Sequence, residues 1–79
     1  MKNTNIVLNN FFIGQNMKEK MNEEGFTVKS FAKEIGVEEN AIYNYFSGRN
    51  VPSMKNACAI ALTLGISLDD LIKFELKEM

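Results

Sequence analysis

Polar side chains that can form directional hydrogen bonds gather between residues 39 and 47 of the chain. They are Glu39, Asn40, Tyr43, Asn44 and Ser47. The pattern predicts a helix over about residues 38–46, and at roughly 100° per residue these side chains fall within one broad arc of it. An Asn amide can form two hydrogen bonds with an adenine edge, and a Glu carboxylate can accept one from a cytosine amino group. An ordinary solvated helix face has the same composition, so the arc alone leaves both interpretations open.

Groups that could hold a phosphate flank this arc on both sides. A helix expected over residues 28–35 would present free backbone N–H groups at Val28 and Lys29, behind a Thr27 cap, and such helix ends favour anions. On the other side lie Ser47, Arg49, Asn50, Lys55 and Asn56. Arg49 is the only arginine of the sequence and is therefore the leading phosphate contact. A solvated loop charge is the alternative for Arg49.

Other kinds of chemistry lack the residues they need. The sequence has no histidine and one cysteine, Cys58, which excludes a disulfide framework and leaves no plausible zinc site. It has no nucleophile paired with a base and no glycine-rich phosphate loop. A chain of 79 residues is also too small for a deep pocket. We therefore expect a protein that is not an enzyme and uses no metal or cofactor, with Cys58 as a buried structural residue.

The bulk composition is that of one small globular domain. Hydrophobic residues make up 46% of the chain, which suffices for a core, but no apolar run approaches the roughly 18 residues of a membrane span. The N-terminus is unlike a signal peptide, and a single cysteine fits a reducing compartment, so we expect a cytoplasmic protein. We expect residues 1–79 to form one domain, with residues 1–11 as either an N-terminal arm or an extension of the first helix.

Glycines mark where the helices that position these side chains should end. Gly25, Gly36, Gly48 and Gly65 each follow a stretch of helical periodicity, and glycine is common just past the last turn of a helix. The sequence predicts helices ending near residue 24, over residues 28–35 and 38–46, and over about residues 53–64. Two of them meet at a tight turn around Gly36, which is the layout of a helix-turn-helix.

A last helix is expected after Ser67, which has Asp70 three residues further on, as in a capping box. Its expected apolar stripe consists of Leu68, Leu71, Ile72 and Leu76. The chain therefore reads as an all-α domain, a compact bundle of about five short helices. The last helix, with Phe74 added, is more apolar than a small monomer can bury. We expect Leu71, Phe74 and Leu76 to contribute to a homodimer contact.

Five motifs together resemble the Cro/C1-type repressor domain, the phage-repressor-like XRE family, over roughly residues 12–72. They are G-F-T at 25–27, F-A-K-E-I-G-V at 31–37, A-I-Y at 41–43, S-G-R-x-x-P-S at 47–53 and I-A-x-x-L-G-I-S-L-D-D-L at 60–71. Each motif alone is weak, but their spacing, glycines, caps and core positions agree. The resemblance implies a lambda-repressor-like fold with the helix-turn-helix at helices 2–3.

The resemblance also implies a role for each group of polar residues. The third helix would enter the major groove of double-stranded DNA. Bases would be read by Glu39, Asn40, Tyr43 and Asn44. Phosphates would be held by Thr27, Val28, Lys29, Ser47, Arg49, Asn50 and Lys55. The implied protein is a phage or bacterial transcriptional regulator, a repressor that binds as a homodimer.

The sequence departs from the family pattern in three places, and the first two departures weigh against strong DNA binding. Val28 stands where the family commonly has glutamine, and two acids, Glu38 and Glu39, open the third helix. Phe46 stands where many relatives carry glutamate, and we expect it to repack the helix end without touching the polar arc. The net charge is −1, whereas nucleic-acid binders are usually basic. The alternative is therefore a protein-binding helix-turn-helix module, such as an antitoxin, an anti-repressor or an inhibitor of a nucleic-acid enzyme.

Overall fold

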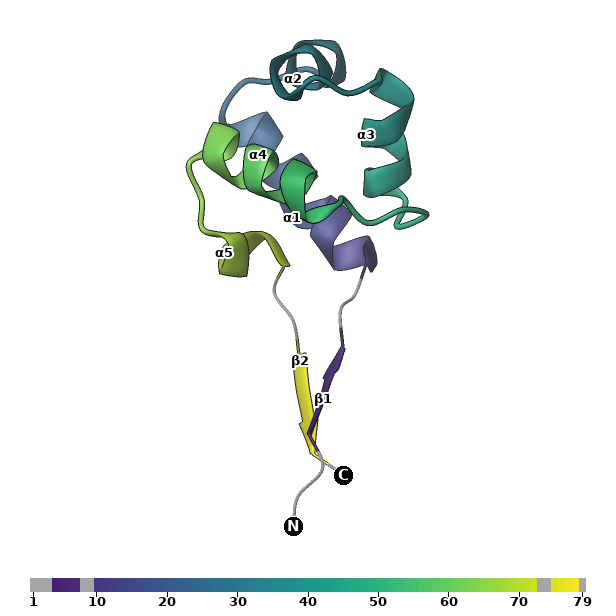
Figure 1. Ribbon diagram of the computed structural model, residues 1–79. Helices are drawn as coiled ribbons and strands as arrows, with labels where there is room; N and C mark the ends of the chain where they lie inside the picture. The colour runs from purple at the N-terminus through teal and green to yellow at the C-terminus, as the bar shows by residue number, and fades with distance from the viewer. Residues whose placement is uncertain (1–3, 8–9, 73–74, 79) are drawn as a thin grey trace.

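The computed structural model describes residues 4–7, 10–72 and 75–78 of the chain. Within these residues five helices form a compact body, from which two strands extend as a narrow ribbon (Figure 1). In chain order the elements are β1 (Thr4–Val7), α1 (Asn10–Glu23), α2 (Val28–Ile35), α3 (Glu39–Phe46), α4 (Met54–Leu64), α5 (Leu68–Ile72) and β2 (Glu75–Glu78). The all-helical, five-helix body confirms the predicted fold class.

The turn between α2 and α3 forms as the sequence predicts. The Thr27 hydroxyl oxygen accepts a hydrogen bond of 3.0 Å from the Ser30 backbone N–H, and the Ser30 hydroxyl oxygen accepts one of 3.0 Å from the Thr27 N–H. At the other end Gly36 has a φ of +75°, and its N–H donates to the Ala32 carbonyl. Because side chains are strained in this left-handed region, glycine lets the chain leave α2 and turn at once into α3.

Serine caps also start α4 and α5. The Ser53 hydroxyl oxygen accepts from the Asn56 N–H at 3.2 Å, and the Ser67 hydroxyl oxygen accepts from the Asp70 N–H at 3.0 Å. Both caps confirm the predicted starts. The predicted extent of the last helix was wrong, since α5 ends at Ile72 and Leu76 lies in β2. Leu76 continues a helical spacing in the sequence, and spacing over so few residues does not separate a helix from a short strand.

The core lies where all five helices converge. Its buried side chains are Ile13, Met17 and Met21 of α1, Phe31 and Ala32 of α2, Ile42 and Tyr45 of α3, Ala57, Ile60, Ala61 and Leu64 of α4, and Leu71 of α5. Each of the first four helices thus contributes one apolar face to the core. Cys58 is a correction, because it is exposed rather than buried. It lies roughly 100° round α4 from Ala57, outside the buried stripe.

A close contact between α1 and α3 fixes the position of α3. A Cβ atom placed on Gly14 would overlap the carbonyl oxygen of Tyr45 and crowd the Cα of Phe46. Gly14 is therefore the residue that lets the two backbones approach. The Asn56 side chain adds a second tie, since its amide donates to the Tyr45 hydroxyl at 3.3 Å.

The ribbon pairs two segments from opposite ends of the described chain. β1 and β2 are antiparallel, with Thr4 opposite Glu78, Ile6 opposite Leu76 and Val7 opposite Glu75. Residues 1–11 had been expected to form an arm or to extend the first helix; residues 4–7 form a strand, and α1 begins at Asn10. Among the described residues no helix has the length and hydrophobicity needed to cross a bilayer.

Candidate nucleic-acid interface

α3 has one face in the core and one in solvent. Ile42 is fully buried and Tyr45 is 6% exposed, so this side of the helix is held by packing. Glu39, Asn40 and Tyr43 are exposed on the other side. The structure therefore brings these three predicted base-reading residues together on the outer face of α3. Amide, carboxylate and phenol groups at successive turns of an exposed helix can match a pattern of donors and acceptors on base edges.

Asn44, the fourth predicted base-reading residue, lies at the edge of this face and is half-buried. The backbone carbonyl oxygen of Asn44 accepts a hydrogen bond from the Ser47 hydroxyl at 3.2 Å and one from the Asn50 N–H at 3.3 Å. The Arg49 N–H in turn approaches the Ser47 hydroxyl oxygen at 3.4 Å. These bonds fold the loop after α3, which contains Arg49, back onto the C-terminal end of that helix.

The N-terminus of α2 borders the same face. Thr27 is exposed, but its hydroxyl oxygen is already engaged by Ser30 in the helix cap. The N–H groups of Val28 and Lys29 have no acceptor within α2, because the first turn of a helix lacks carbonyls four residues earlier. This helix end can therefore offer an anion two backbone donors, which is the contact that the sequence predicted for it.

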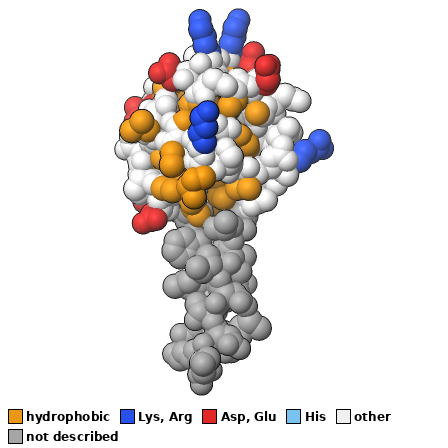
Figure 2. Space-filling view, viewed as in Figure 1, with side chains coloured by type: hydrophobic (Ala, Val, Ile, Leu, Met, Phe, Trp, Pro, Cys, Tyr) orange, Lys and Arg blue, Asp and Glu red, His pale blue; other side chains and the backbone are white. Residues whose placement is uncertain are grey.

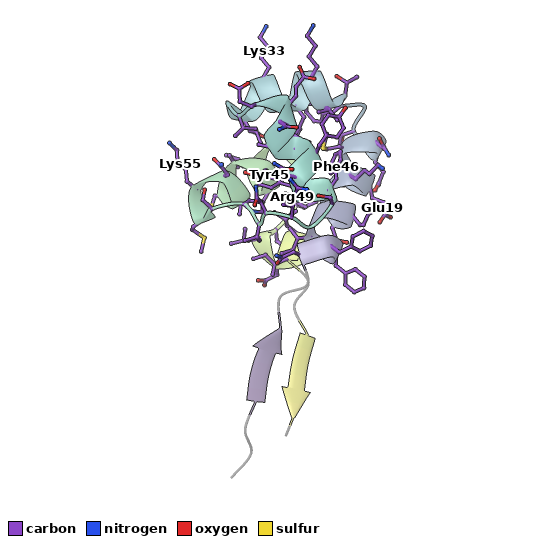
Figure 3. All side chains as sticks on the ribbon, turned by 90° about the vertical axis from the view of Figure 1, so that its right-hand side faces the viewer. Glu19, Lys33, Tyr45, Phe46, Arg49 and Lys55 are labelled. Carbon is purple, nitrogen blue, oxygen red and sulfur yellow. The ribbon has the colours of Figure 1, made fainter. Side chains whose placement is uncertain are left out.

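Cationic side chains stand around α3. Figure 3 looks onto the α3 side of the body, with Arg49 near its centre, Lys55 of α4 at one edge and Lys33 of α2 at the far end. Figure 2 shows cationic side chains projecting from the α2 end of the body. Lys29, Lys33, Arg49 and Lys55 are all exposed, and within the described residues none forms an ion pair. Their charges are available to an anionic partner.

Two acids sit among these cations. Glu38 and Glu39 line a shallow groove of about 350 Å³ together with Lys29 and Lys33, at the start of α3. Glu38 is the N-cap residue of α3 but makes no side-chain capping bond. The lysines on the neighbouring helix therefore offset part of the negative charge that the sequence places at the recognition end of α3.

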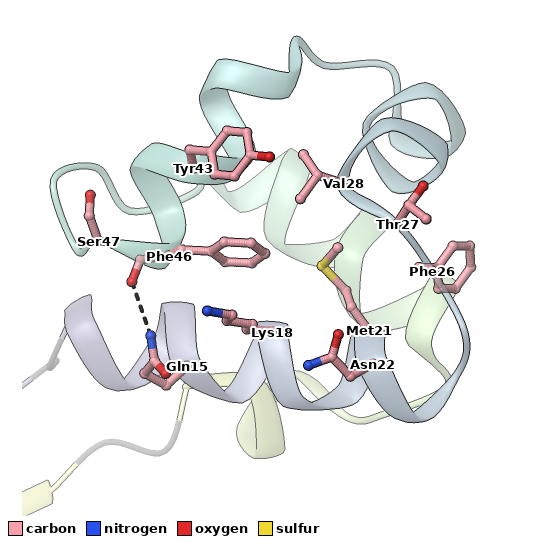
Figure 4. A pocket seen from close by; sticks show the side chains of 10 residues that line it. All are labelled: Gln15, Lys18, Met21, Asn22, Phe26, Thr27, Val28, Tyr43, Phe46 and Ser47. Atoms are coloured by element: carbon pink, nitrogen blue, oxygen red, sulfur yellow. Dashed lines mark hydrogen bonds between the residues drawn. The ribbon is translucent and has the colours of Figure 1, made fainter.

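A larger groove, of about 560 Å³, opens between α1, the start of α2 and α3 (Figure 4). Phe46 lies within it, where its ring meets the edge of the Tyr43 ring at a centroid distance of 6.1 Å. Phe46 was expected to leave the polar arc untouched; that expectation was wrong, because residues three apart on a helix are neighbours. The phenylalanine thereby supports one of the exposed residues of α3.

α1 contributes residues that sequence reasoning missed. The Gln15 amide donates to the Phe46 carbonyl at 3.3 Å, and the Lys18 ammonium lies 5.6 Å from the centre of the Phe46 ring. Lys18 thus lies in the groove that also borders Thr27 and Tyr43. No sequence signal marks Lys18, since its distance from Phe46 depends on how closely α1 approaches α3 at Gly14.

Of the three residues predicted to contribute to a homodimer contact, the structure describes the side chain of one, Leu71. Leu71 is fully buried within one chain, so its side chain is not available to a second copy. It belongs to the buried core cluster, in which it is the contribution of α5. Phe74 lies outside the described residues, and Leu76 is in β2.

Comparison with known proteins shows which family the chain belongs to. The sequence profile of a family described as helix-turn-helix matches residues 17–71. The chain belongs to the helix-turn-helix family. This family consists of DNA-binding transcription regulators of the Cro/C1 (XRE) type, so the predicted kinship is confirmed, as is the expectation that the chain is not an enzyme. Among curated protein sequences none matches.

Solved structures of helix-turn-helix proteins share the fold. The restriction-modification controller protein C.AhdI from Aeromonas hydrophila has a TM-score of 0.74 and 21% identity, with 80% of this chain and 96% of that chain covered. The SOS-response transcriptional repressor LexA from Eubacterium rectale has a TM-score of 0.76 and 25% identity, over 81% and 68%. The N-terminal DNA binding domain of SinR from Bacillus subtilis has a TM-score of 0.72 and 22% identity, over 77% and 90%.

Proposed function

We propose that this helix-turn-helix protein is a sequence-specific transcriptional regulator, a cytoplasmic repressor that reads the major groove with α3. The observation that carries the proposal is the outer face of α3, where Glu39, Asn40 and Tyr43 are exposed together. α3 is eight residues long and its inner face is packed on the core, so it can enter a major groove as a rigid body.

The surroundings of α3 support a position across the DNA backbone. The free N–H groups at the start of α2 would bind a phosphate on one side, and Arg49 with Lys55 would bind phosphates on the other. Lys18 in the groove beside Tyr43 is a further candidate. With so few cations, the non-specific affinity should be modest, and base contacts should contribute a large share of the binding energy.

The proposal includes a homodimer and repression. Helix-turn-helix domains read paired half-sites as dimers, because one short helix contacts few base pairs. The fold similarity to LexA, which is named a transcriptional repressor, supports repression as the direction of control. With Leu71 buried, the dimer contact is assigned to the part of the chain that contains Leu76.

One selection experiment tests this function. Duplexes bound by the protein are enriched from a random pool at low salt, and the affinity of the winner is then followed as salt rises. A pseudo-palindrome whose binding weakens steeply with salt is expected, since released counterions drive the association. If no duplex is enriched at the lowest salt, the DNA-binding proposal fails. The exposed Glu38 and Glu39 would then favour the protein-binding alternative.

A further inference from the structure

Tyr43 is an exposed residue of α3 whose ring contacts another aromatic ring. The residue is 55% exposed, and its ring meets the Phe46 ring at a centroid distance of 6.1 Å and an interplanar angle of 88°. Aromatic pairs favour this edge-to-face arrangement, because the positive edge of one ring meets the negative face of the other. The contact therefore favours one orientation of a side chain that otherwise extends into solvent.

Phe46 is itself positioned by α1. The Lys18 ammonium lies 5.6 Å from the centre of the Phe46 ring, and Figure 4 shows this ring between Tyr43 and Lys18. A cation is attracted to the electron-rich face of an aromatic ring. The Gln15 amide also donates to the Phe46 carbonyl at 3.3 Å, and the main chain of Phe46 lies against Gly14. The support of Tyr43 is thus fixed to the body of the domain through its side chain and its main chain.

The Tyr43 hydroxyl is directed toward the start of α2. In Figure 4 it points toward Val28, and both residues line the same groove. The function proposed above assigns a phosphate of the DNA backbone to this end of α2. A phenol hydroxyl can donate a hydrogen bond to a phosphate oxygen. The orientation therefore favours a contact between Tyr43 and the DNA backbone.

The two grooves beside α3 differ in charge. The groove at the start of α3 has two glutamates and two lysines in its lining. In the groove that Tyr43 lines, Lys18 is the charged residue among those that form the lining. Because an ammonium attracts a phosphate and a carboxylate repels it, the groove beside Tyr43 is the more favourable place for a DNA strand.

We propose that Phe46 is a positioning residue, which holds Tyr43 so that its hydroxyl binds a phosphate of the DNA strand passing the start of α2. The proposal rests on the DNA-binding function proposed above, and it assigns Tyr43 to the backbone rather than to a base. A side chain that is already ordered loses less conformational freedom on binding, so the contact with Phe46 should raise the affinity for DNA. Lys18 supports the ring and adds positive charge to the groove.

Removal of the hydroxyl tests the phosphate contact. Tyr43→Phe keeps the ring and loses only the oxygen. A phosphate contact carries no sequence information, so binding to the selected duplex and to an unrelated duplex should both weaken, each by about three- to tenfold. Gel shifts at one salt concentration measure both. The dependence of affinity on salt should stay unchanged, because an uncharged phenol displaces no counterion.

Two results would overturn the phosphate contact. A loss of affinity for the selected duplex alone would make Tyr43 a base-reading residue. Unchanged affinity for both duplexes would remove the Tyr43 hydroxyl from the DNA-binding surface.

A double-mutant cycle tests the positioning by Phe46. Phe46→Leu keeps an apolar side chain in the groove but removes the aromatic pair. Because the phenol is then no longer held, Tyr43→Phe in this background should weaken binding by less than about twofold. Phe46→Met is a second apolar replacement and should give the same result.

Phe26→Leu is the matched control. Phe26 is also half-buried and lines the same groove, but its ring meets that of Phe31, at a centroid distance of 5.0 Å and an angle of 75°. In the Phe26→Leu background, Tyr43→Phe should keep its full effect of about three- to tenfold. An effect of Tyr43→Phe that is equal in the Phe26 and Phe46 backgrounds would show that Phe46 does not position the phenol.

NMR of the free protein provides a measurement that needs no DNA. Side-chain coupling constants of Tyr43 should report one dominant χ1 rotamer in the original protein and in Phe26→Leu, and averaging over rotamers in Phe46→Leu. Averaging in the original protein would contradict the proposal. Circular dichroism and urea unfolding check that each variant is folded under the conditions of the binding measurements.

Failure of this inference differs from failure of the proposed function. If a specific duplex is enriched and Asn40→Ala weakens its binding while Tyr43→Phe does not, the DNA-binding function stands and the inference is wrong. If no duplex is enriched at the lowest salt, both are wrong.

Discussion

The inner and outer faces of α3 obey different constraints. On the inner face Ile42 has no exposed surface and Tyr45 is tied to Asn56, so each side chain is fixed by shape and by a partner. On the outer face Asn40 and Tyr43 are in solvent, and the packing of the body does not require an amide or a phenol there. The same eight-residue helix thus serves stability on one side, and we propose that it serves recognition on the other.

This difference teaches which residues identify the fold and which identify the function. The inner face is constrained by core volume, so its residues are shared in type by proteins with unrelated targets. Under the proposed function, the outer face is constrained by the DNA that it binds. Substitutions on the two sides should therefore act on different measurements, stability for one and affinity for the other.

The largest expected effect is on the inner face. Ile42→Ala should lower the free energy of unfolding by about 2–5 kcal/mol, because it removes buried methyl groups and leaves a cavity. Leu62→Ala on α4 is the control, since Leu62 is 84% exposed, and should change it by less than about 0.5 kcal/mol. Urea unfolding measures both. If both variants lost the same free energy of unfolding, the inner face of α3 would not contribute more to stability than an exposed position does.

On the outer face, Asn40→Ala should leave urea unfolding almost unchanged. It should weaken binding to the selected duplex by about 10- to 100-fold, because a bidentate contact to a base discriminates by about 1–3 kcal/mol. Binding to an unrelated duplex, measured by gel shift at the same salt, should be unaffected. A variant that binds both duplexes like the original protein would remove Asn40 from the recognition surface.

Arg49→Ala should weaken binding to every duplex alike. Losing one phosphate contact should reduce the slope of log K against log salt by about 0.9. Lys20→Ala is the matched loss of charge, because Lys20 pairs with Glu23 and Glu24 at 3.8 and 3.7 Å on α1. It should leave the slope unchanged. If the variant lost affinity for the selected duplex only, Arg49 would instead be a base-reading residue.

The smallest expected effect concerns the acids at the start of α3. Glu38→Gln should raise affinity for DNA at low salt by up to about fivefold, because exposed charges interact by roughly 0.2–1 kcal/mol and salt screens them. The gain should vanish at high salt. Weaker binding after this change would give Glu38 an attractive contact and contradict the view that it opposes DNA.

Local chemistry made much of the fold predictable. The caps at Thr27, Ser53 and Ser67 and the turn at Gly36 depend on residues within a few positions, so their types reveal them. The arc of α3 was predictable for the same reason, since a helix repeats locally. The predicted phosphate contacts remain predictions, with their supporting geometry at the start of α2 and in the loop after α3.

What the sequence did not reveal depends on contacts between distant residues. The exposure of Cys58, the strand that contains Leu76 and the place of Lys18 beside Phe46 all depend on how elements meet. Leu71 is a further example of a residue whose surroundings the sequence did not reveal. Its apolar type indicates that it must be covered, but only the packing tells whether its own chain or a second copy covers it.

The backbone contact at Gly14 has a consequence for how such a protein could acquire new targets. α3 rests on α1 through the main chain at Tyr45, and main-chain atoms are the same whatever side chains the helix bears. Exchanging the outward residues would therefore leave the tilt and depth of the helix as they are. Under the proposed function, the base sequence that is read could change through substitutions of the outward residues alone, while the position of α3 on the body stays the same.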